Sequence, residues 1–311
     1  MPDDYDDELR RLIDGDPTLG LVAQGSRQHR KRFAAALQIE REAAREAGML
    51  AYQARILVQC SLPYRCQLMN EWTRTNGNMT LTLWAPKAIG LPYGAYPRLI
   101  LTWVTTEAVR TQQRQLDIHD SLTRFMAELG IAKHANGREI RRFKDQTRRL
   151  FGTTVASTVV EQSDHGRIIH EAGFRLSSEF HLWWDAWGGS GDGTHVVLTE
   201  EFFRAITERP VPVKLRALKA LKGSALALDI YSWLGYRLSY LKQSTTIPWE
   251  ILQTQFGGEY ADTKQGRHGF KREFTVQLQA ALQVYAEAKV TVDQQGVTLA
   301  PSPLAIDRRA D

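Results

Sequence analysis

The chain has 311 residues, a length that predicts two domains of ordinary size and excludes a small disulfide-stapled scaffold. Hydrophobic residues make up 43% of the chain and charged residues 24%, and no stretch approaches the roughly 20 consecutive apolar residues of a membrane span. We therefore expect a soluble, cytoplasmic protein without a secretory signal. Its two cysteines, Cys60 and Cys66, have no second pair to complete a zinc site and are expected to be reduced and buried.

The net charge of +5 is unevenly distributed along the chain. Residues 1–16 hold seven acidic residues against two arginines, which is a net −5 and leaves +10 on the remainder. A basic body favours a polyanionic partner, although net charge by itself says nothing about the fold.

The first quarter of the chain is predicted to be an acidic tail over 1–25 and a helical segment over 26–75. Within that segment, 26–57 is rich in Ala, Glu, Gln and Arg, as in a helix. Its basic start, at 27–32, is a candidate for phosphate contacts. Leu and Thr then alternate over 78–84, which predicts a strand, and the apolar run 98–105 predicts a second strand.

Three helices and a hairpin are expected next, within a first domain over 76–209. The predicted helices run from Thr105 or Thr106 to Gln115, from a cap at Asp120 or Ser121 to Gly130, and from 137 to 151. The predicted strands are 153–162 and 167–184, joined by a turn at 163–166. This is the element order of a winged helix-turn-helix.

The same order returns in a predicted second domain over 210–302, followed by a tail over 303–311. Residues 211–214 follow two prolines and are expected to form a linker or domain start. Helices are predicted over 217–241, from Pro248 to Gly257, and over 269–287, and two short β runs over 288–299. The expected fold class is α+β and mostly helical, with two tandem winged helix-turn-helix domains after an N-terminal helical segment. The repeat is architectural, because the two copies share little residue identity.

The predicted helix 137–151 has a strongly basic face opposite its apolar face. At 100 degrees per residue, Ile140, Phe143, Thr147, Leu150 and Phe151 share one side. The opposite side carries Arg138, Arg141, Arg142, Lys144, Arg148 and Arg149. A third helix in this position is the recognition helix of a helix-turn-helix, and arginine can bind phosphate or guanine with two parallel hydrogen bonds. A solvated face with internal ion pairs is the alternative for this helix. We expect Asp145 to orient Arg141 or Arg149 rather than to contact a base.

Further DNA contacts are predicted elsewhere in both units. His165 and Arg167 flank the hairpin turn of the first unit, where a wing reaches phosphate or the minor groove, although simple turn residues would look the same. In the second unit, the candidates are Lys271, Arg272 and Thr275 on the third helix and Lys264, Arg267 and His268 in a basic loop before it. An ordinary solvated face remains the alternative for these residues.

No motif for catalysis, a cofactor or a metal is recognised. The glycine-rich stretch 188–193 lacks the Lys-Ser or Lys-Thr of a phosphate loop, and the eight histidines show no metal-binding spacing. We therefore expect a protein that is not an enzyme and that has no cofactor.

Several stretches resemble the plasmid-encoded RepA-type replication initiators. They are LPYGAYPRLILTWVTTEAVRTQ (91–112), SLTRFMAELGI (121–131), QTRRLF (146–151), FHLWWD (180–185), PVPVKLRALKALKGSALALDIYSWLGYRL (210–238) and IPWEILQTQFG (247–257). The resemblance implies a bacterial plasmid initiator that binds repeated origin sites, helps to open the duplex and recruits host helicase-loading proteins. It also implies a monomer-dimer equilibrium and repression of the initiator's own promoter.

The expected function is therefore initiation of plasmid replication through sequence-specific binding of double-stranded DNA. Two alternatives stay open. A transcriptional repressor of the same architecture needs the same DNA-binding surfaces, and a rolling-circle nicking enzyme belongs to a different class but lacks its metal-ligand signature.

Overall fold

The computed structural model describes residues 50–305, apart from 119–120, 132–134, 164–165, 182–193 and 209. The acidic tail, the basic cluster at 27–32 and His165 lie outside the described residues. Where the described part begins, the prediction of one helix up to residue 57 is wrong. Strand β1 (Leu50–Gln53) comes first, and the short helix α3 (Arg55–Gln59) follows it.

Helix α4 (Ala95–Thr111) replaces the strand predicted over 98–105 and the separate helix predicted after Thr106. The run from Pro97 to Thr105 is buried on every side, so its apolar residues show neither the alternation of a strand nor the stripe of a surface helix. Pro97 lies in the first turn, where a backbone N–H has no intrahelical partner, and so it does not break the helix.

The next two predicted helices are confirmed. Helix α5 (Leu122–Glu128) begins after Ser121, whose side chain accepts a hydrogen bond from the backbone N–H of Arg124, and ends before Gly130, which has φ +71°. Helix α6 (Gly137–Phe151) has the predicted bounds. The short strand β4 (Gln115–Asp117) lies between α4 and α5.

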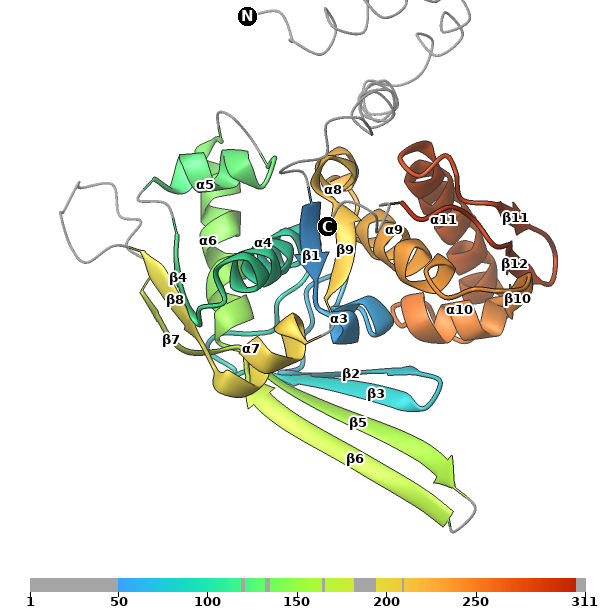
Figure 1. Ribbon diagram of the computed structural model, residues 1–311, viewed down its shortest axis with the longest axis horizontal. Helices are drawn as coiled ribbons and strands as arrows, with labels where there is room; N and C mark the ends of the chain where they lie inside the picture. Colours follow the sequence, from blue (N-terminus) through green and yellow to red (C-terminus); the bar gives the residue numbers. More distant parts are fainter. Residues whose placement is uncertain are drawn as a thin grey trace, which may run out of the picture.

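Two sheets surround these helices. Strands β2 (Glu71–Asn76), β3 (Met79–Trp84), β5 (Thr154–Ser163) and β6 (Gly166–Arg175) form a four-stranded antiparallel sheet in the order β2-β3-β5-β6. Strands β7 (Ser177–His181) and β8 (His195–Leu198) join β4 in the order β4-β8-β7. The predicted β5–β6 hairpin is confirmed and projects away from the helices (Figure 1). The predicted strand 167–184 is instead two strands, β6 and β7, that belong to different sheets.

The second half begins with helix α7 (Glu200–Thr207) and strand β9 (Val211–Lys214). The residues of β9, predicted to be a linker or domain start, pair with β1 in an antiparallel ribbon. The predicted helix 217–241 is two helices, α8 (Leu215–Leu221) and α9 (Ala225–Leu238), because Ser224 caps a new helix by accepting the backbone N–H of Ala227.

The last elements largely follow the prediction. They are β10 (Thr245–Pro248), α10 (Trp249–Phe256), α11 (Lys264–Gln283), β11 (Val290–Val292) and β12 (Gly296–Leu299), with the three strands in the order β10-β12-β11. Helix α11 begins five residues before the predicted start, since Thr263 caps it by accepting the backbone N–H of Gly266. Lys264, Arg267 and His268 are therefore helical residues and do not form a loop.

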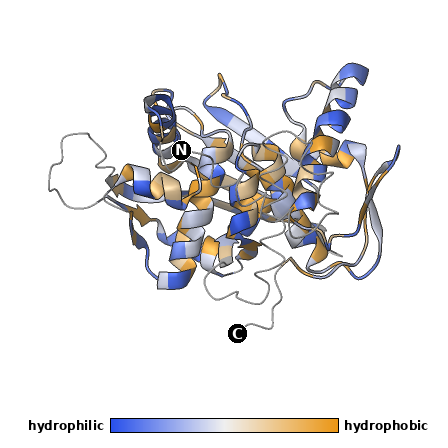
Figure 2. Ribbon diagram, turned by 90° about the horizontal axis from the view of Figure 1, so that it is seen from above, coloured by the Kyte–Doolittle hydropathy of each residue, from blue (hydrophilic) through white to orange (hydrophobic). Residues whose placement is uncertain are grey.

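One continuous hydrophobic core extends through both halves of the described chain. Figure 2 shows hydrophobic residues gathered toward the middle of the molecule, with hydrophilic residues at the outer ends of its helices. Within the described ranges, no helix combines the length and apolar character that crossing a membrane requires.

Candidate nucleic-acid interface

Helix α6 is held in place by its cap and by its apolar face. The Asn136 side chain accepts the backbone N–H groups of Arg138 and Glu139, and the Glu139 carboxylate accepts the N–H of Asn136, which forms a complete capping box. On the inner face, the buried Phe143 ring lies 5.7 Å from the ring of Phe125. These contacts fix which side of α6 faces outward.

The basic residues of α6 divide into an exposed group and a group held against the protein. Arg138, Arg141, Arg142 and Arg148 are exposed, whereas Lys144 and Arg149 are half-buried. The Arg142 guanidinium lies over the Tyr96 ring, 5.5 Å from its centre. Within the described ranges, Arg138, Arg141 and Arg148 form no side-chain ion pair, so their charges are directed to solvent or to a ligand.

Arg149 is occupied by contacts inside the protein. Its Nε lies 2.8 Å from the Asp145 carboxylate, and its guanidinium lies 5.7 Å from the centre of the Tyr93 ring. The prediction that Asp145 orients an arginine is confirmed for Arg149. Arg149 is therefore less suited than Arg138, Arg141 or Arg148 to leave the surface and bind DNA.

The second basic surface lies at the N-terminal half of α11. Lys264, Arg267, His268 and Arg272 are exposed, and Lys271 and Thr275 are half-buried. Arg267 pairs with Asp262 at 2.6 Å, and the Lys271 ammonium lies over the Trp249 ring at 5.3 Å. The packing of Phe270 and Phe274 against Trp249 keeps the basic side turned outward.

Two open hollows border this part of α11. One lies between α10 and the first turns of α11, and the other lies between α11 and the turn that joins β11 to β12. The second hollow is lined by basic and amide side chains of α11 together with Val292 at the end of β11 and Asp293 and Gln294 of the turn. A concave surface that exposes both charge and hydrogen-bonding groups is suited to the edge of a duplex.

The predicted wing residue Arg167 lies in a different sheet from the strand that follows α4. Arg167 is exposed on β6 and pairs with Gln162 of β5, in the sheet formed with β2 and β3. The strand that follows α4 is β4, and its neighbour is β8.

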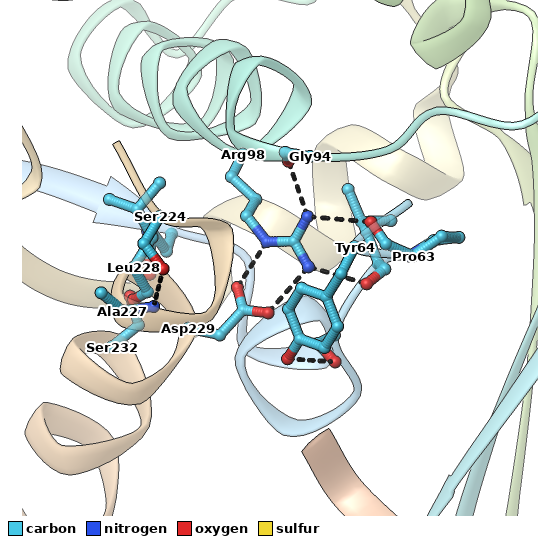
Figure 3. Close-up of polar contacts among 12 residues, drawn as sticks. Pro63, Tyr64, Gly94, Arg98, Ser224, Ala227, Leu228, Asp229 and Ser232 are labelled. Carbon is cyan, nitrogen blue, oxygen red and sulfur yellow. Dashed lines mark hydrogen bonds and ion pairs between the residues drawn. The ribbon is translucent and has the colours of Figure 1, made fainter. Parts of the chain in front are cut away.

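A buried ion pair that the sequence pattern did not predict holds the two halves together. Arg98 of α4 donates from Nε and Nη2 to the two carboxylate oxygens of Asp229 on α9, at 2.7 and 2.8 Å (Figure 3). Both side chains are nearly buried, with exposed fractions of 6% and 12%. Burial alone would lower the pKa of Arg98, but the Asp229 carboxylate outweighs this effect and the pKa is raised.

The remaining guanidinium hydrogens of Arg98 bind backbone carbonyls before β2 and at the start of α4. Nη1 donates to the carbonyl oxygens of Pro63 and Gly94, and Nη2 donates to that of Leu62 at 2.7 Å. A signal for this pair exists in the sequence, since each charge interrupts an apolar helical run. A buried charge requires a partner, so an arginine and an aspartate that each interrupt an apolar helix are candidates to form an ion pair with each other.

The two cysteines differ in environment. Cys60 is buried and Cys66 is exposed, and both are free thiols. The prediction of a buried thiol is therefore wrong for Cys66. Among the described residues, no group of three or more His, Cys, Asp or Glu side chains is arranged to hold a metal ion.

Comparison with known proteins decides the family. The sequence pattern of the family described as plasmid-encoded RepA protein matches residues 91–251, slightly more than half of the chain. The chain belongs to this family of replication initiators. The matched part of this RepA family member includes α6 and both residues of the Arg98–Asp229 pair, whereas α11 lies beyond it. Among curated proteins, none matches the chain in sequence.

A solved structure with a similar fold covers most of the chain. A crystal structure of a selenomethionine derivative of domains 2 and 3 of RctB has a TM-score of 0.52 at 12% identity and covers 82% of this chain and 97% of that one. A second crystal structure of RctB domains 2–3, residues 155–483, has a TM-score of 0.47 at 13% identity and covers 78% and 94%. The likeness to the first structure shows a shared arrangement of elements.

Proposed function

We propose that this RepA family member initiates plasmid replication by binding repeated double-stranded sites at the plasmid origin. In this proposal, α6 and α11 are the recognition helices of two winged-helix units. The protein binds and distorts DNA without a catalytic step of its own, and origin opening comes from bending and from several copies bound side by side.

One observation carries the proposal: the same topology occurs twice. In the first half, once the hairpin β5–β6 between α6 and β7 is set aside, the order α4, β4, α5, α6, β7, β8 is accompanied by the strand order β4-β8-β7. In the second half, α9, β10, α10, α11, β11, β12 is accompanied by β10-β12-β11. In both, the strand after the first helix pairs with the last strand, and the third helix carries an exposed basic face.

This correspondence reassigns the wing of the first unit. By analogy with β11 and β12, the wing is formed by β7 and β8, and the β5–β6 hairpin is an insertion that extends the sheet of β2 and β3. Arg167 then belongs to the insertion and not to the wing.

A pair of charge-matched variants tests the recognition helices. We expect Arg141→Ala/Arg148→Ala to weaken binding of an origin repeat by at least about 10-fold, because removing a side chain that binds DNA costs about 1–3 kcal/mol. The slope of log K against log salt should become shallower by about 0.9 for each phosphate that the variant no longer neutralises. The control is Arg110→Ala/Arg204→Ala, which removes the same charge from two exposed positions on other helices. Equal effects of the two double variants on binding would refute the assignment of α6.

The initiator function itself needs a second experiment. Footprinting on the DNA that flanks the gene should show protection at regular spacing. A plasmid that carries this gene and those repeats, with no other initiator, should replicate under our proposal and should not if the protein is only a repressor. Incubation of supercoiled origin DNA with the protein and Mg²⁺ should yield no nicked circles, whereas a covalent protein adduct would establish the nicking alternative.

The proposal also includes recruitment of host helicase-loading proteins and a monomer-dimer equilibrium. Related initiators repress their own promoter as dimers, and we propose the same for this chain. Sedimentation across a concentration range, with and without a repeat, is the measurement that tests the equilibrium.

A further inference from the structure

The loop Pro63–Asn70, between α3 and β2, has an apolar tip in water. Leu68 is fully exposed and Met69 is 70% exposed, the two highest exposed fractions among the large hydrophobic residues of the described ranges. Two large apolar side chains on one short loop forgo about 1.5–3 kcal/mol each that burial would provide. An adjacent pair of this kind indicates a surface that is covered when the protein binds something.

The base of this loop is held firmly, although its tip is exposed. The Pro63 carbonyl oxygen accepts hydrogen bonds from the Gly94 backbone N–H at 3.1 Å and from Arg98 Nη1 at 3.2 Å. The backbone N–H groups of Tyr64 and Arg65 donate to one oxygen of Glu259 at 2.9 and 2.7 Å. The tip is therefore presented from a rigid base that both halves of the protein share.

The same contacts place the loop between the two basic surfaces. On one side, the Arg142 guanidinium of α6 lies 3.7 Å from the point that a Cβ on Gly94 would occupy, and Gly94 binds Pro63. On the other side, Glu259 precedes the first residue of α11, Lys264, by only five positions. The base of the loop thus lies near Arg142 of α6 on one side and binds the segment that leads into α11 on the other.

The geometry of B-form DNA predicts which groove would face a segment between the two helices. When two recognition helices occupy successive major grooves on one face of B-form DNA, the minor groove between them faces whatever segment lies between the helices. Proteins that kink DNA from the minor groove insert Leu, Met, Ile, Phe or Pro side chains between base steps. Arg65, whose side chain is 78% exposed, lies three positions before Leu68 and pairs with the Glu259 carboxylate at 3.3 Å.

We propose that Leu68 and Met69 enter the minor groove between the two recognition helices and partly unstack one base step of each bound repeat. This inference rests on the proposed DNA-binding function and adds to it a device for distorting the origin. The energy of unstacking a base step, a few kcal/mol, is met by the contacts of the two helices and by burial of the two apolar side chains.

The test uses the full-length chain and duplexes that carry one footprinted repeat, with 2-aminopurine placed at each position in turn. Fluorescence of this base rises when it loses stacking. We expect a rise at one or two adjacent positions between the two major-groove contacts when the wild type binds. The variant Leu68→Ala/Met69→Ala should lose at least about 80% of that rise while its affinity falls by less than about 10-fold. Ile168→Ala/Ile169→Ala, which truncates two exposed aliphatic residues on β6, is the matched control. It should retain both the fluorescence rise and the affinity of the wild type.

Three outcomes would overturn the inference. If the Leu68→Ala/Met69→Ala variant unstacks the same position as the wild type, the tip does not enter the duplex and its partner is a protein. If saturating wild type raises fluorescence at no position, no step is unstacked. Both results leave the proposed DNA binding intact, whereas wild type that binds no flanking duplex would refute the proposed function and this inference together.

Discussion

Replacing Asp229 by alanine tests how strongly the two halves of the molecule are held together. The carboxylate accepts two hydrogen bonds from Arg98, at 2.7 and 2.8 Å, and both side chains are nearly buried. Without Asp229, the guanidinium stays in the interior with only carbonyl oxygens as partners. Removing one partner of a buried ion pair costs about 3–5 kcal/mol because the other charge is left uncompensated. We expect the free energy of unfolding to fall by that amount.

Urea unfolding followed by tryptophan fluorescence measures this destabilisation, and the chain offers a control for it. Arg114 and Glu200 form a pair of similar length, 2.9 Å, but their side chains are 42% and 51% exposed. Glu200→Ala should therefore cost no more than about 1 kcal/mol. The double variant Arg98→Met/Asp229→Leu, which removes both charges, should be more stable than Asp229→Ala alone. A destabilisation below about 1 kcal/mol for Asp229→Ala would refute the reasoning.

Three further predictions concern thiols, pH and the start of α11. A thiol reagent should label Cys66 rapidly in the native protein and Cys60 only on unfolding, and rapid labelling of both thiols would contradict the structure. Burial raises the pKa of Cys60 to about 11 from 9.0, so between these values the unfolded chain has lost a proton that the folded chain retains. Stability should therefore fall as the pH rises from about 9 to 11, by up to about 2–3 kcal/mol for this group, and Cys60→Ala should flatten the alkaline limb of stability against pH. Finally, a Cβ at Gly266 would lie 2.0 Å from the Ala261 carbonyl oxygen, so Gly266→Ala should displace the first turn of α11. The control is Gly137→Ala at the start of α6, where a Cβ meets open space. The affinity of the Gly266→Ala variant for an origin repeat should fall more than that of the control. Equal affinities of the two variants would argue against α11 as a contact surface.

Local sequence was enough to predict helix α6 and its outward face. The Asn136 to Glu139 capping box, the apolar stripe through Phe143 and the glycine at 152 all act within a few residues of each other. The β5–β6 hairpin and helix α10 were predictable for the same reason, since a turn and a proline at a helix start are local signals.

Interactions between residues distant in sequence decided the elements that local patterns predicted wrongly. The apolar run in α4 is surrounded by other elements, so its pattern has no period that distinguishes helix from strand. The partner of the β5–β6 hairpin is β3, more than 60 residues earlier, which no turn signal specifies.

The sequence by itself therefore determined the basic surfaces of this protein, because charge and helical period are written in consecutive residues. Only the tertiary structure decided how these surfaces are placed relative to one another. Arg98 and Asp229 are 131 positions apart, and Tyr64 and Glu259 are 195 apart, and these contacts join the two halves and hold the base of the Pro63–Asn70 loop against both of them. The physical reason is that a buried charge or an orphaned backbone N–H requires a partner but does not specify where in the chain that partner lies.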